Sequence, residues 1–439
     1  MTRITLLPKD DRTNGWSALL PSRQAKPSLS GDIVADFVVI GAGYAGLGAA
    51  RRLGELRPHA KIVVFDAQEL GEGASGRNSG FAIDLPHNVG SSLEELAKGK
   101  AYMRLARAGI ASLRDSVQRH GIECDWSEQG KYHTASSERG AEEILLPTVE
   151  ELKRLNEPYE WLDAGKTAKR LGTSHFVASV YTPGTALLNP AAINRGLGEN
   201  LPENVTLYEN CPVLEADLGT TISLKTAHGS VRAQKVILAV NGLAMRFGFW
   251  KGRLLNFAAH ASLSRRLTAA EQAALGNIAP WGSTPANAFA GITMRYTNDH
   301  RILIRQNIHF CPSLRQSDER RARVGAEHQR LFDDRFPMLK GVTMERTWTG
   351  YICLSRNGAP GFGQVAPNVW SAVCQNAVGV AKGTISGRLA AAMALGEDDP
   401  LIADMISLGT PAPVPPRPLL DIGVRARFAY EIFRNRHEA

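Results

Sequence analysis

The clearest candidates for ligand binding surround a glycine-rich turn that lies between two apolar runs. Residues 37–40 are apolar and lead into Gly-x-Gly-x-x-Gly at 41–46, after which residues 44–56 have the composition of a helix. In this spacing the glycines permit a tight turn, close approach of a pyrophosphate, and packing of the helix on the strand. A second apolar run, 62–65, ends in Asp66, whose carboxylate can accept hydrogen bonds from a ribose. Together these features predict a dinucleotide site.

A second glycine-rich segment follows Asp66 closely. Residues 71–81 contain four glycines among small and amide side chains, a composition that disfavours a helix and suits a backbone running along a ligand. Within it, Arg77 offers a guanidinium that can neutralise phosphate. An ordinary flexible surface loop is the alternative, but the position next to Asp66 favours ligand contact.

The elements that position these residues must belong to a globular protein with more than one domain. The chain has 439 residues, 44% of them hydrophobic and 21% charged, which suffices for two or three domains. No apolar run reaches the ~18 residues of a membrane span. Residues 1–16 become charged before a signal-peptide core could form. We therefore expect no membrane span and a cytoplasmic location.

Cysteine content and charge exclude several other classes. The five cysteines are scattered without a Cys-x-x-Cys pair, which predicts buried free thiols and neither a disulfide framework nor a metal site. The formal net charge is +8, yet the densest basic patch, 320–323, lies beside Asp318 and Glu319. A solvated helix face explains this patch best, with a mild preference for anionic substrates as the alternative. We expect no nucleic-acid partner.

The remaining patterns predict an interrupted nucleotide domain interleaved with a second domain. Residues 235–242 form another buried strand, residues 254–308 alternate as in an antiparallel sheet, and residues 369–384 return to the strand-and-glycine-turn style. The expected fold is α/β plus α+β, a discontinuous Rossmann-like cofactor domain with an antiparallel-sheet substrate domain. The expected ranges are an arm, 1–30; cofactor domain, 31–95, 176–242 and 346–405; substrate domain, 96–175 and 243–345; and a Pro-rich segment with a helix, 406–439.

Three separated motifs together resemble a known family. They are the turn at 41–46, Ala-Ser-Gly-Arg-Asn-x-Gly at 74–80, and the glycine turn at 376–384 that opens a helix. In this order they resemble the D-amino-acid-oxidase-like, or glycine/sarcosine oxidase, superfamily of FAD-dependent oxidoreductases. The form of 74–80, the hairpin Arg295-x-Thr297-x-Asp299-x-Arg301 and the Pro-rich tail are closest to its gamma-glutamylputrescine oxidase branch.

The resemblance implies FAD extended across the cofactor domain. The implied contacts are Gly41, Ala42, Gly43, Tyr44, Ala45 and Gly46 at the pyrophosphate; Asp66, where the family more often has Glu, at the ribose; Ser75, Arg77, Asn78, Ser79, Gly80 and Phe81 along the ribityl chain and flavin; Val213 at adenine; Asn241 and Gly242 closing over the cofactor; and Gly379, Val380, Lys382, Gly383 and Thr384 at the flavin.

The C-terminal turn would act on the reduced flavin, which carries negative charge. Free amides at a helix N-terminus stabilise such charge, and Lys382 could add a full positive charge; alternatively, Lys382 points into solvent and only the amides matter. The family often has glycine and histidine where Ala377 and Val378 stand. Some members attach flavin through a cysteine at the position of Gly350, so non-covalent FAD is expected here.

The chemistry implied is hydride transfer from the α-carbon of an amine to flavin N5, giving an imine that hydrolyses. This explains why no Ser-His-Asp set or carboxylate pair stands out. The strand near Leu303 lacks the lysine that several relatives use with oxygen, so O2 and another acceptor both stay open. Trp348 and Tyr351 are the preferred substrate contacts and, with Lys382, the expected catalytic residues; the wider candidates for the pocket are His87, His260, Trp281, Arg295 and Arg305.

Two other functions remain as alternatives. An NAD-dependent dehydrogenase could use the same N-terminal turn, but would leave the C-terminal glycine turn unexplained. A flavin-bearing subunit or RNA-modifying domain, working with a partner, would give the basic charge a role. The leading prediction is an FAD-dependent oxidoreductase acting on a primary or secondary amine, γ-glutamylated or N-alkylated.

Overall fold

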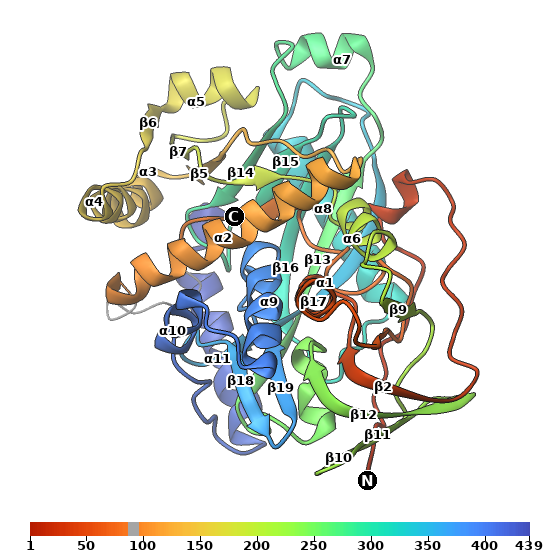
Figure 1. Ribbon diagram of the computed structural model, residues 1–439. Helices are drawn as coiled ribbons and strands as arrows, with labels where there is room; N and C mark the ends of the chain where they lie inside the picture. The colour runs from red at the N-terminus through yellow and green to blue at the C-terminus, as the bar shows by residue number, and fades with distance from the viewer. Residues whose placement is uncertain (87–95) are drawn as a thin grey trace.

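The computed structural model describes residues 1–86 and 96–439 (Figure 1). Its first large sheet has parallel strands at its centre, where β12, β2, β3 and β9 follow one another and β19 pairs with the other edge of β12. Short antiparallel strands extend this sheet. The strands are β1 (Thr2–Arg3), β10 (Glu215–Leu218), β11 (Ile222–Lys225), β12 (Gly229–Leu238), β2 (Gly31–Ile40), β3 (Ile62–Phe65), β9 (Val205–Tyr208), β18 (Gly361–Ala366) and β19 (Val369–Val373).

Helices cover this sheet because their small and apolar residues pack against its buried strands. Helix α1 (Tyr44–Leu56) packs on α9 (Ala381–Leu395), so the first and last parts of the cofactor region lie side by side (Figure 1). Leu47, Leu53, Val39 and Val64 belong to their shared core. The predicted strand–turn–helix–strand unit is confirmed, and the helix begins and ends at the expected residues.

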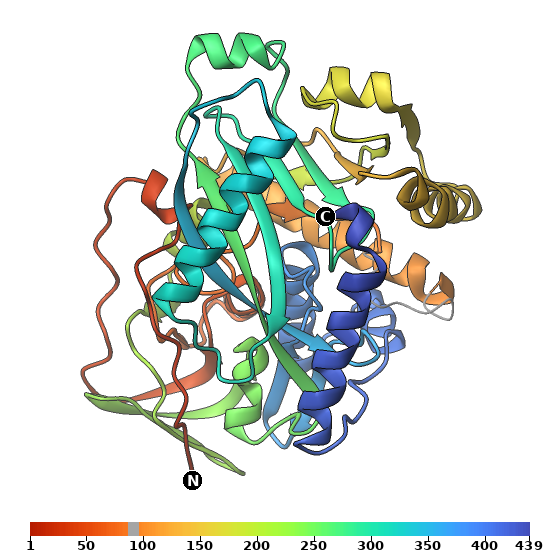
Figure 2. The same cartoon turned by 180° about the vertical axis from the view of Figure 1, so that it is seen from behind.

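The second sheet is mostly antiparallel and confirms the α+β part of the predicted fold. Helix α8 (Asp318–Arg335) crosses one face of this sheet over β13, β16 and β17 (Figure 2). Only the β5–β14 pair is parallel in the part of the sheet that the structure describes. Its order is β17 (Met344–Ser355), β13 (Leu254–Ser264), β16 (Ile302–Phe310), β15 (Thr293–Tyr296), β14 (Trp281–Pro285), β5 (Lys131–Ala135), β7 (Ala178–Thr182) and β6 (Glu160–Asp163).

The other described elements connect and cap the two sheets. They are the strand pair β4 (Phe81–Ala82) and β8 (Ala186–Leu187); the helices α2 (Leu96–His120), α3 (Glu138–Gly140), α4 (Leu146–Leu155), α5 (Ala164–Leu171), α6 (Pro190–Glu199), α7 (Ala269–Ala274), α10 (Pro400–Ser407) and α11 (Leu419–Arg434); and the short turns of helix η1 (Ser17–Leu19), η3 (Ala141–Leu145), η4 (Asn241–Phe247) and η5 (Arg436–Glu438).

The chain passes between the sheets near two of the expected boundaries but not at them. Strand β7 lies in the second sheet although residues after 175 were expected in the cofactor domain, and β17 continues in that sheet to Ser355, past 345. Short apolar strands have the same pattern in either sheet, so their sequence does not specify which sheet they join. The other domain ranges stay predictions.

Two further expectations bear on the described residues. All five cysteines are free and buried. Within residues 1–86 and 96–439, no helix has both the length and the apolarity to cross a membrane.

Candidate functional site

Two adjoining cavities lie between the carboxyl ends of the parallel strands and the second sheet. The larger has a volume of about 230 Å³ and the smaller about 200 Å³. Gly43, Ser75, Asn241 and Tyr351 line both of them. In open α/β sheets, ligands bind at the carboxyl ends of the strands, which is where these cavities meet.

The glycine turn brings backbone amides to the junction of the cavities. Gly41 adopts a φ of +101°, and a Cβ on Gly46 would stand 1.7 Å from the carbonyl oxygen of Gly41. The N-cap residue of α1, Gly43, has no side chain, and Ser75 Oγ accepts a hydrogen bond from the Tyr44 amide at 3.1 Å. The turn therefore needs its glycines, and its positive helix end faces the cavities.

Asp66 stands at the end of β3 in the wall of the smaller cavity. It accepts hydrogen bonds from the amides of Ala42 at 2.6 Å and Gln68 at 2.9 Å. Burial raises the pKa of its carboxyl to about 6. No ion pair to Asp66 occurs in the described part of the chain, so neutral hydroxyl donors, such as those of a ribose, suit this carboxylate.

Two buried acceptor atoms provide a test of the fit to FAD. Asn256 Oδ1 at the smaller cavity and Gln375 Oε1 at the larger cavity have no hydrogen-bond partner among the described residues. Buried acceptors are normally paired, and FAD carries hydroxyl and N–H donors in both of its halves. The paired cavities, the open acceptors and the glycine turn together fit an extended flavin dinucleotide.

The segment 71–81 lines both cavities. The sequence predicted that Arg77 could neutralise a phosphate, but its guanidinium pairs with carboxylates of the protein. Arg77 is 7% exposed, and its guanidinium pairs with Asp11 at 2.8 Å and Asp10 at 3.1 Å. Its Nε also donates to Glu72 O at 2.8 Å. Arg77 is thus committed to the N-terminal arm, and its charge is balanced by carboxylates instead of being available to a phosphate.

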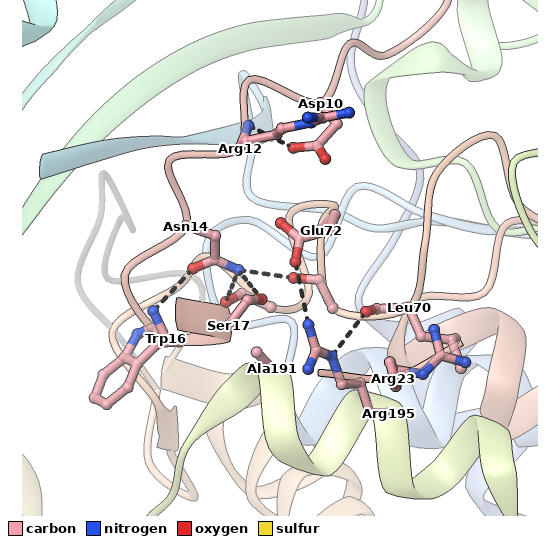
Figure 3. A network of polar contacts seen from close by, with 12 residues as sticks. Asp10, Arg12, Asn14, Trp16, Ser17, Arg23, Leu70, Glu72, Ala191 and Arg195 are labelled. Carbon is pink, nitrogen blue, oxygen red and sulfur yellow. Dashed lines mark hydrogen bonds and ion pairs between the residues drawn. The ribbon is translucent and has the colours of Figure 1, made fainter. Parts of the chain in front are cut away.

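The N-terminal arm, residues 1–30, forms hydrogen bonds to the segment 71–81. Asn14 Nδ2 donates to Gly71 O at 2.8 Å and to Gly76 O at 3.1 Å. Asn14 Oδ1 also accepts from the Trp16 amide (Figure 3). The Trp16 indole donates to Asn78 O at 2.8 Å. Further arm residues form part of the smaller cavity's wall, namely Ile4, Leu6, Leu7, Pro8, Lys9 and Asp11.

The expected catalytic residues are only partly brought together. Trp348 is fully buried behind Arg77, donates to Arg77 O at 3.0 Å and packs edge-on against Trp16, and it lines neither cavity. Lys382 is 3% exposed, and its Nζ lies 5.3 Å from the centre of the Tyr102 ring, so the side chain does not point into solvent. Lys382 lines neither cavity. Of the three, only Tyr351 lines the cavities, and burial raises the pKa of its phenol to about 12.

The C-terminal turn supplies backbone to the larger cavity. This cavity is lined by Gly379, Val380 and Gly383, and the N-cap residue of α9, Val380, has no side-chain group that could cap the helix. Asn376 and Ala377 adopt positive φ of 53° and 66° before this helix. Asn376 is held by the Ser355 amide at 2.8 Å and by donating to Gly358 O at 2.7 Å. These hydrogen bonds fix Asn376 ahead of α9, and Ala377 adopts a left-handed conformation that glycine reaches more easily.

The other predicted contacts divide between the cavities and their supports. The smaller cavity is lined by Gly41, Ala42, Val213 and Gly242. The larger cavity is lined by Tyr44, Ala45, Asn78, Ser79 and Phe81. Gly46, Gly80 and Thr384 line neither; Gly80 O accepts from Arg295 at 3.1 Å, and Thr384 donates to Val380 O.

The wider candidates are mostly structural. His260 of β13 is buried, and its Nδ1 is hydrogen-bonded to Thr349 Oγ1 of β17. Burial lowers the pKa of its imidazole to about 3. Trp281 lies in the core of the second sheet, and Arg295 donates to the carbonyls of residues 79, 80 and 188. Arg305 lines the larger cavity. His87 lies outside the described residues.

Several contributing residues were missed. Asn14, Asn256 and Gln375 are single polar residues in segments remote from the glycine turns. No spacing marks them, because their roles come from contacts between distant parts of the chain.

Comparisons with known proteins agree with this geometry. The chain is 25% identical over 376 residues to the probable oxidoreductase OrdL of Haemophilus influenzae, covering 84% of each. It is 25% identical over 401 residues to the gamma-glutamylputrescine oxidoreductase of Escherichia coli, covering 88% of this chain and 90% of that one. Its fold resembles the glycine oxidase of Geobacillus kaustophilus with a TM-score of 0.68 at 19% identity, covering 84% and 96%.

The family model agrees with the two cavities and the turns that line them. Residues 36–393, which include both glycine turns and the segment between Asp66 and Phe81, match the model described as FAD dependent oxidoreductase, DAO. The chain therefore belongs to the DAO family of FAD-dependent oxidoreductases, which act on amines and amino acids, and FAD is the cofactor that its two adjoining cavities fit.

Proposed function

We propose that this chain oxidises an amine at its α-carbon to an imine, which hydrolyses to an aldehyde or keto product. The larger cavity carries this proposal. No Asp, Glu or His is among the described residues that line it. Chemistry that needs a strong carboxylate or imidazole base therefore has no support there, whereas hydride removal from a neutral amine needs only orientation and a hydride acceptor.

Bound FAD supplies the hydride acceptor, and the protein's part is to hold and shield the reactants. Phe289, Ile308 and Phe428 give the larger cavity apolar walls that exclude water. The uncapped start of α9, with Gly379 and Gly383, presents backbone amides that stabilise negative charge on the cofactor. Tyr351 stays a protonated phenol at neutral pH and can donate a hydrogen bond.

We further propose that FAD is held without a covalent bond. Gly350 offers no nucleophile, and Cys353 is buried beside Cys374, which together with burial raises the pKa of its thiol well above the ordinary value. A thiol that stays protonated is a poor nucleophile. Acid precipitation is expected to leave a colourless pellet and a yellow supernatant; yellow retained in the pellet would contradict the proposal.

The relative from E. coli is named for gamma-glutamylputrescine, and we propose a substrate of the same broad kind, a γ-glutamylated or N-alkylated amine, with O2 as acceptor. The NAD-dependent alternative loses its basis because the family is FAD-dependent. The test is an anaerobic screen of amines, amides of putrescine and N-methyl amino acids against the purified holoprotein. Bleaching of the flavin by one amine class, and recovery of the colour on admitting air, is the expected result. If none of these amines bleached a flavin that dithionite still reduces, the proposed activity would be wrong.

A further inference from the structure

Helix α11, residues 419–434, leaves an apolar surface uncovered on the outside of the molecule, where it is the dark blue helix of Figure 2. Ten large hydrophobic side chains are exposed among the described residues, and five of them belong to this helix. These five are between 45% and 66% exposed: Leu419, Ile422, Tyr430, Ile432 and Phe433. Single exposed hydrophobic side chains are normal on a protein surface, but a cluster on one short helix marks an interaction site.

The helix has two apolar faces on opposite sides. Its inner face, with Leu420, Val424 and Phe428, packs on the second sheet, and the ring of Phe428 stacks on that of Phe257 with the ring centres 5.0 Å apart. Residues three or four positions apart lie on the same side of a helix. By this spacing the outer face consists of Leu419, Ile422, Ala426, Tyr430 and Phe433. A helix that is apolar on two sides is normally buried on both, whereas the protein itself buries only the inner face of α11.

Arginines border the outer face along both of its edges. At 3.6 residues per turn, Arg425 lies at one edge and Arg434 at the other. Both are exposed, and neither forms an ion pair within residues 1–86 and 96–439. The two acids of the helix, Asp421 and Glu431, lie toward the inner face, and each pairs with an arginine. The outer face and its edges therefore carry positive charge and no negative charge.

This charge pattern decides between the two surfaces that could cover the outer face. If α11 of a second copy packed on it, in either direction, the edges that carry Arg425 and Arg434 would meet edges that also carry arginine, and like charges repel. An anionic lipid surface instead offers an apolar layer for the hydrophobic side chains and negative headgroups for the arginines. The 16 residues of α11 extend about 24 Å, which is shorter than the ~30 Å hydrocarbon core of a bilayer, so the helix would lie in the interface.

We propose that α11 docks the protein on an anionic lipid surface. The side chains of the outer face insert among the lipid headgroups, and Arg425 and Arg434 pair with the negative groups of the lipids. Phe428, on the inner face of the same helix, lines the larger cavity, so docking places this cavity about one helix diameter, ~10 Å, from the lipid. The docking surface lies outside both cavities, and the proposal does not depend on the proposed amine oxidation.

Cosedimentation of the holoprotein with vesicles measures the docking. Vesicles of phosphatidylcholine alone are compared with vesicles in which about one third of the lipid is phosphatidylserine. The natural protein is expected to partition at least about 10-fold more strongly onto the anionic vesicles, and this preference should shrink at high salt because ions screen the arginines.

A first pair of double variants tests the apolar side chains. Ile422→Ser with Phe433→Ser removes two of them from the outer face, and partitioning onto anionic vesicles should fall at least about 10-fold. Its matched control is Val34→Ser with Ile406→Ser, which removes two hydrophobic side chains of similar exposure from β2 and α10. This control should bind as the natural protein does.

A second pair of double variants tests the charge. Arg425→Gln with Arg434→Gln should lower partitioning onto anionic vesicles about 10-fold and change partitioning onto phosphatidylcholine little. Arg3→Gln with Arg119→Gln removes the same charge from exposed positions of β1 and α2, and should bind as the natural protein does.

Three results would overturn the proposal. The first is a natural protein that does not bind anionic vesicles, or binds both kinds of vesicle equally; this comparison needs no variant, so it holds even if a substitution prevented folding. The second is an equal loss in a double variant and its control, which would show general adsorption of a basic protein. The third is a dimer in sedimentation velocity that Ile422→Ser with Phe433→Ser dissociates, which would assign the outer face to a second copy.

Discussion

Replacing Asn14 by Ala tests whether the N-terminal arm holds the cofactor segment in place. Asn14 is 3% exposed, and its Nδ2 donates to Gly71 O and Gly76 O. Each buried hydrogen bond contributes ~1 kcal/mol, and leaving a buried acceptor open costs ~1–3 kcal/mol. Loss of two such bonds is expected to destabilise this segment by about 2–4 kcal/mol.

The segment between Gly71 and Phe81 lines both cavities, so its order is coupled to FAD binding. We expect the dissociation constant of FAD to rise by at least about 10-fold in Asn14→Ala, which needs only ~1.4 kcal/mol of the loss. Titration of apoprotein with FAD, followed by quenching of flavin fluorescence, measures this constant. Arg12→Asn is the matched control, because Arg12 is exposed in the same arm at a φ of 54° that asparagine tolerates. Unchanged FAD affinity in Asn14→Ala, together with a lowered melting temperature, would refute the coupling.

Two other substitutions test the glycine turn and the ribose acid. In Gly46→Ala the new Cβ would meet Gly41 O, so the purified protein should lack FAD, whereas Gly423→Ala, with nothing near its Cβ on an exposed helix, should keep it and melt slightly higher. Asp66 has a pKa raised from 3.8 to about 6, so in the apoprotein this group's contribution to stability is present below 3.8 and is lost as the pH rises through 6. Hydroxyl donors of FAD favour the ionised carboxylate, so FAD affinity should increase as the pH rises through about 6, as calorimetric titration at several pH values would show. Asp66→Asn should weaken FAD binding and remove this dependence; a natural protein with pH-independent affinity would show that the carboxylate does not bind the cofactor.

The strand–turn–helix–strand unit could be predicted from sequence because each of its parts is specified locally. The apolar runs, the glycine spacing and the helix after Tyr44 all act within neighbouring residues. The structure reproduces the bounds of the helix and of the second strand, while the first strand ends at Ile40 as expected but begins at Gly31, before the apolar run. The α9 turn was also predictable, since its glycines precede a helix of small residues. The first turn predicted a dinucleotide site, and both turns with the segment 74–80 carried the family resemblance that implied FAD.

Side-chain direction and long-range pairing were not predictable. Lys382 and Trp348 carry suitable groups in suitable segments, but packing turns one toward Tyr102 and the other behind Arg77. Arg77 illustrates the same difficulty, because its partners Asp10 and Asp11 come from the arm. The sequence contains these residues but not the contacts that determine which groups remain open to a ligand.

We propose that the glycine turns at 41–46 and 376–384 together bind one FAD across the two adjoining cavities. Calorimetric titration of apoprotein with FAD, FMN and NAD tests it most directly, since FMN lacks the half assigned to the smaller cavity and NAD lacks the flavin. We predict one FAD per chain, bound much more tightly than FMN, with no competition from NAD. FMN binding as tightly as FAD, or displacement of FAD by NAD, would contradict the account.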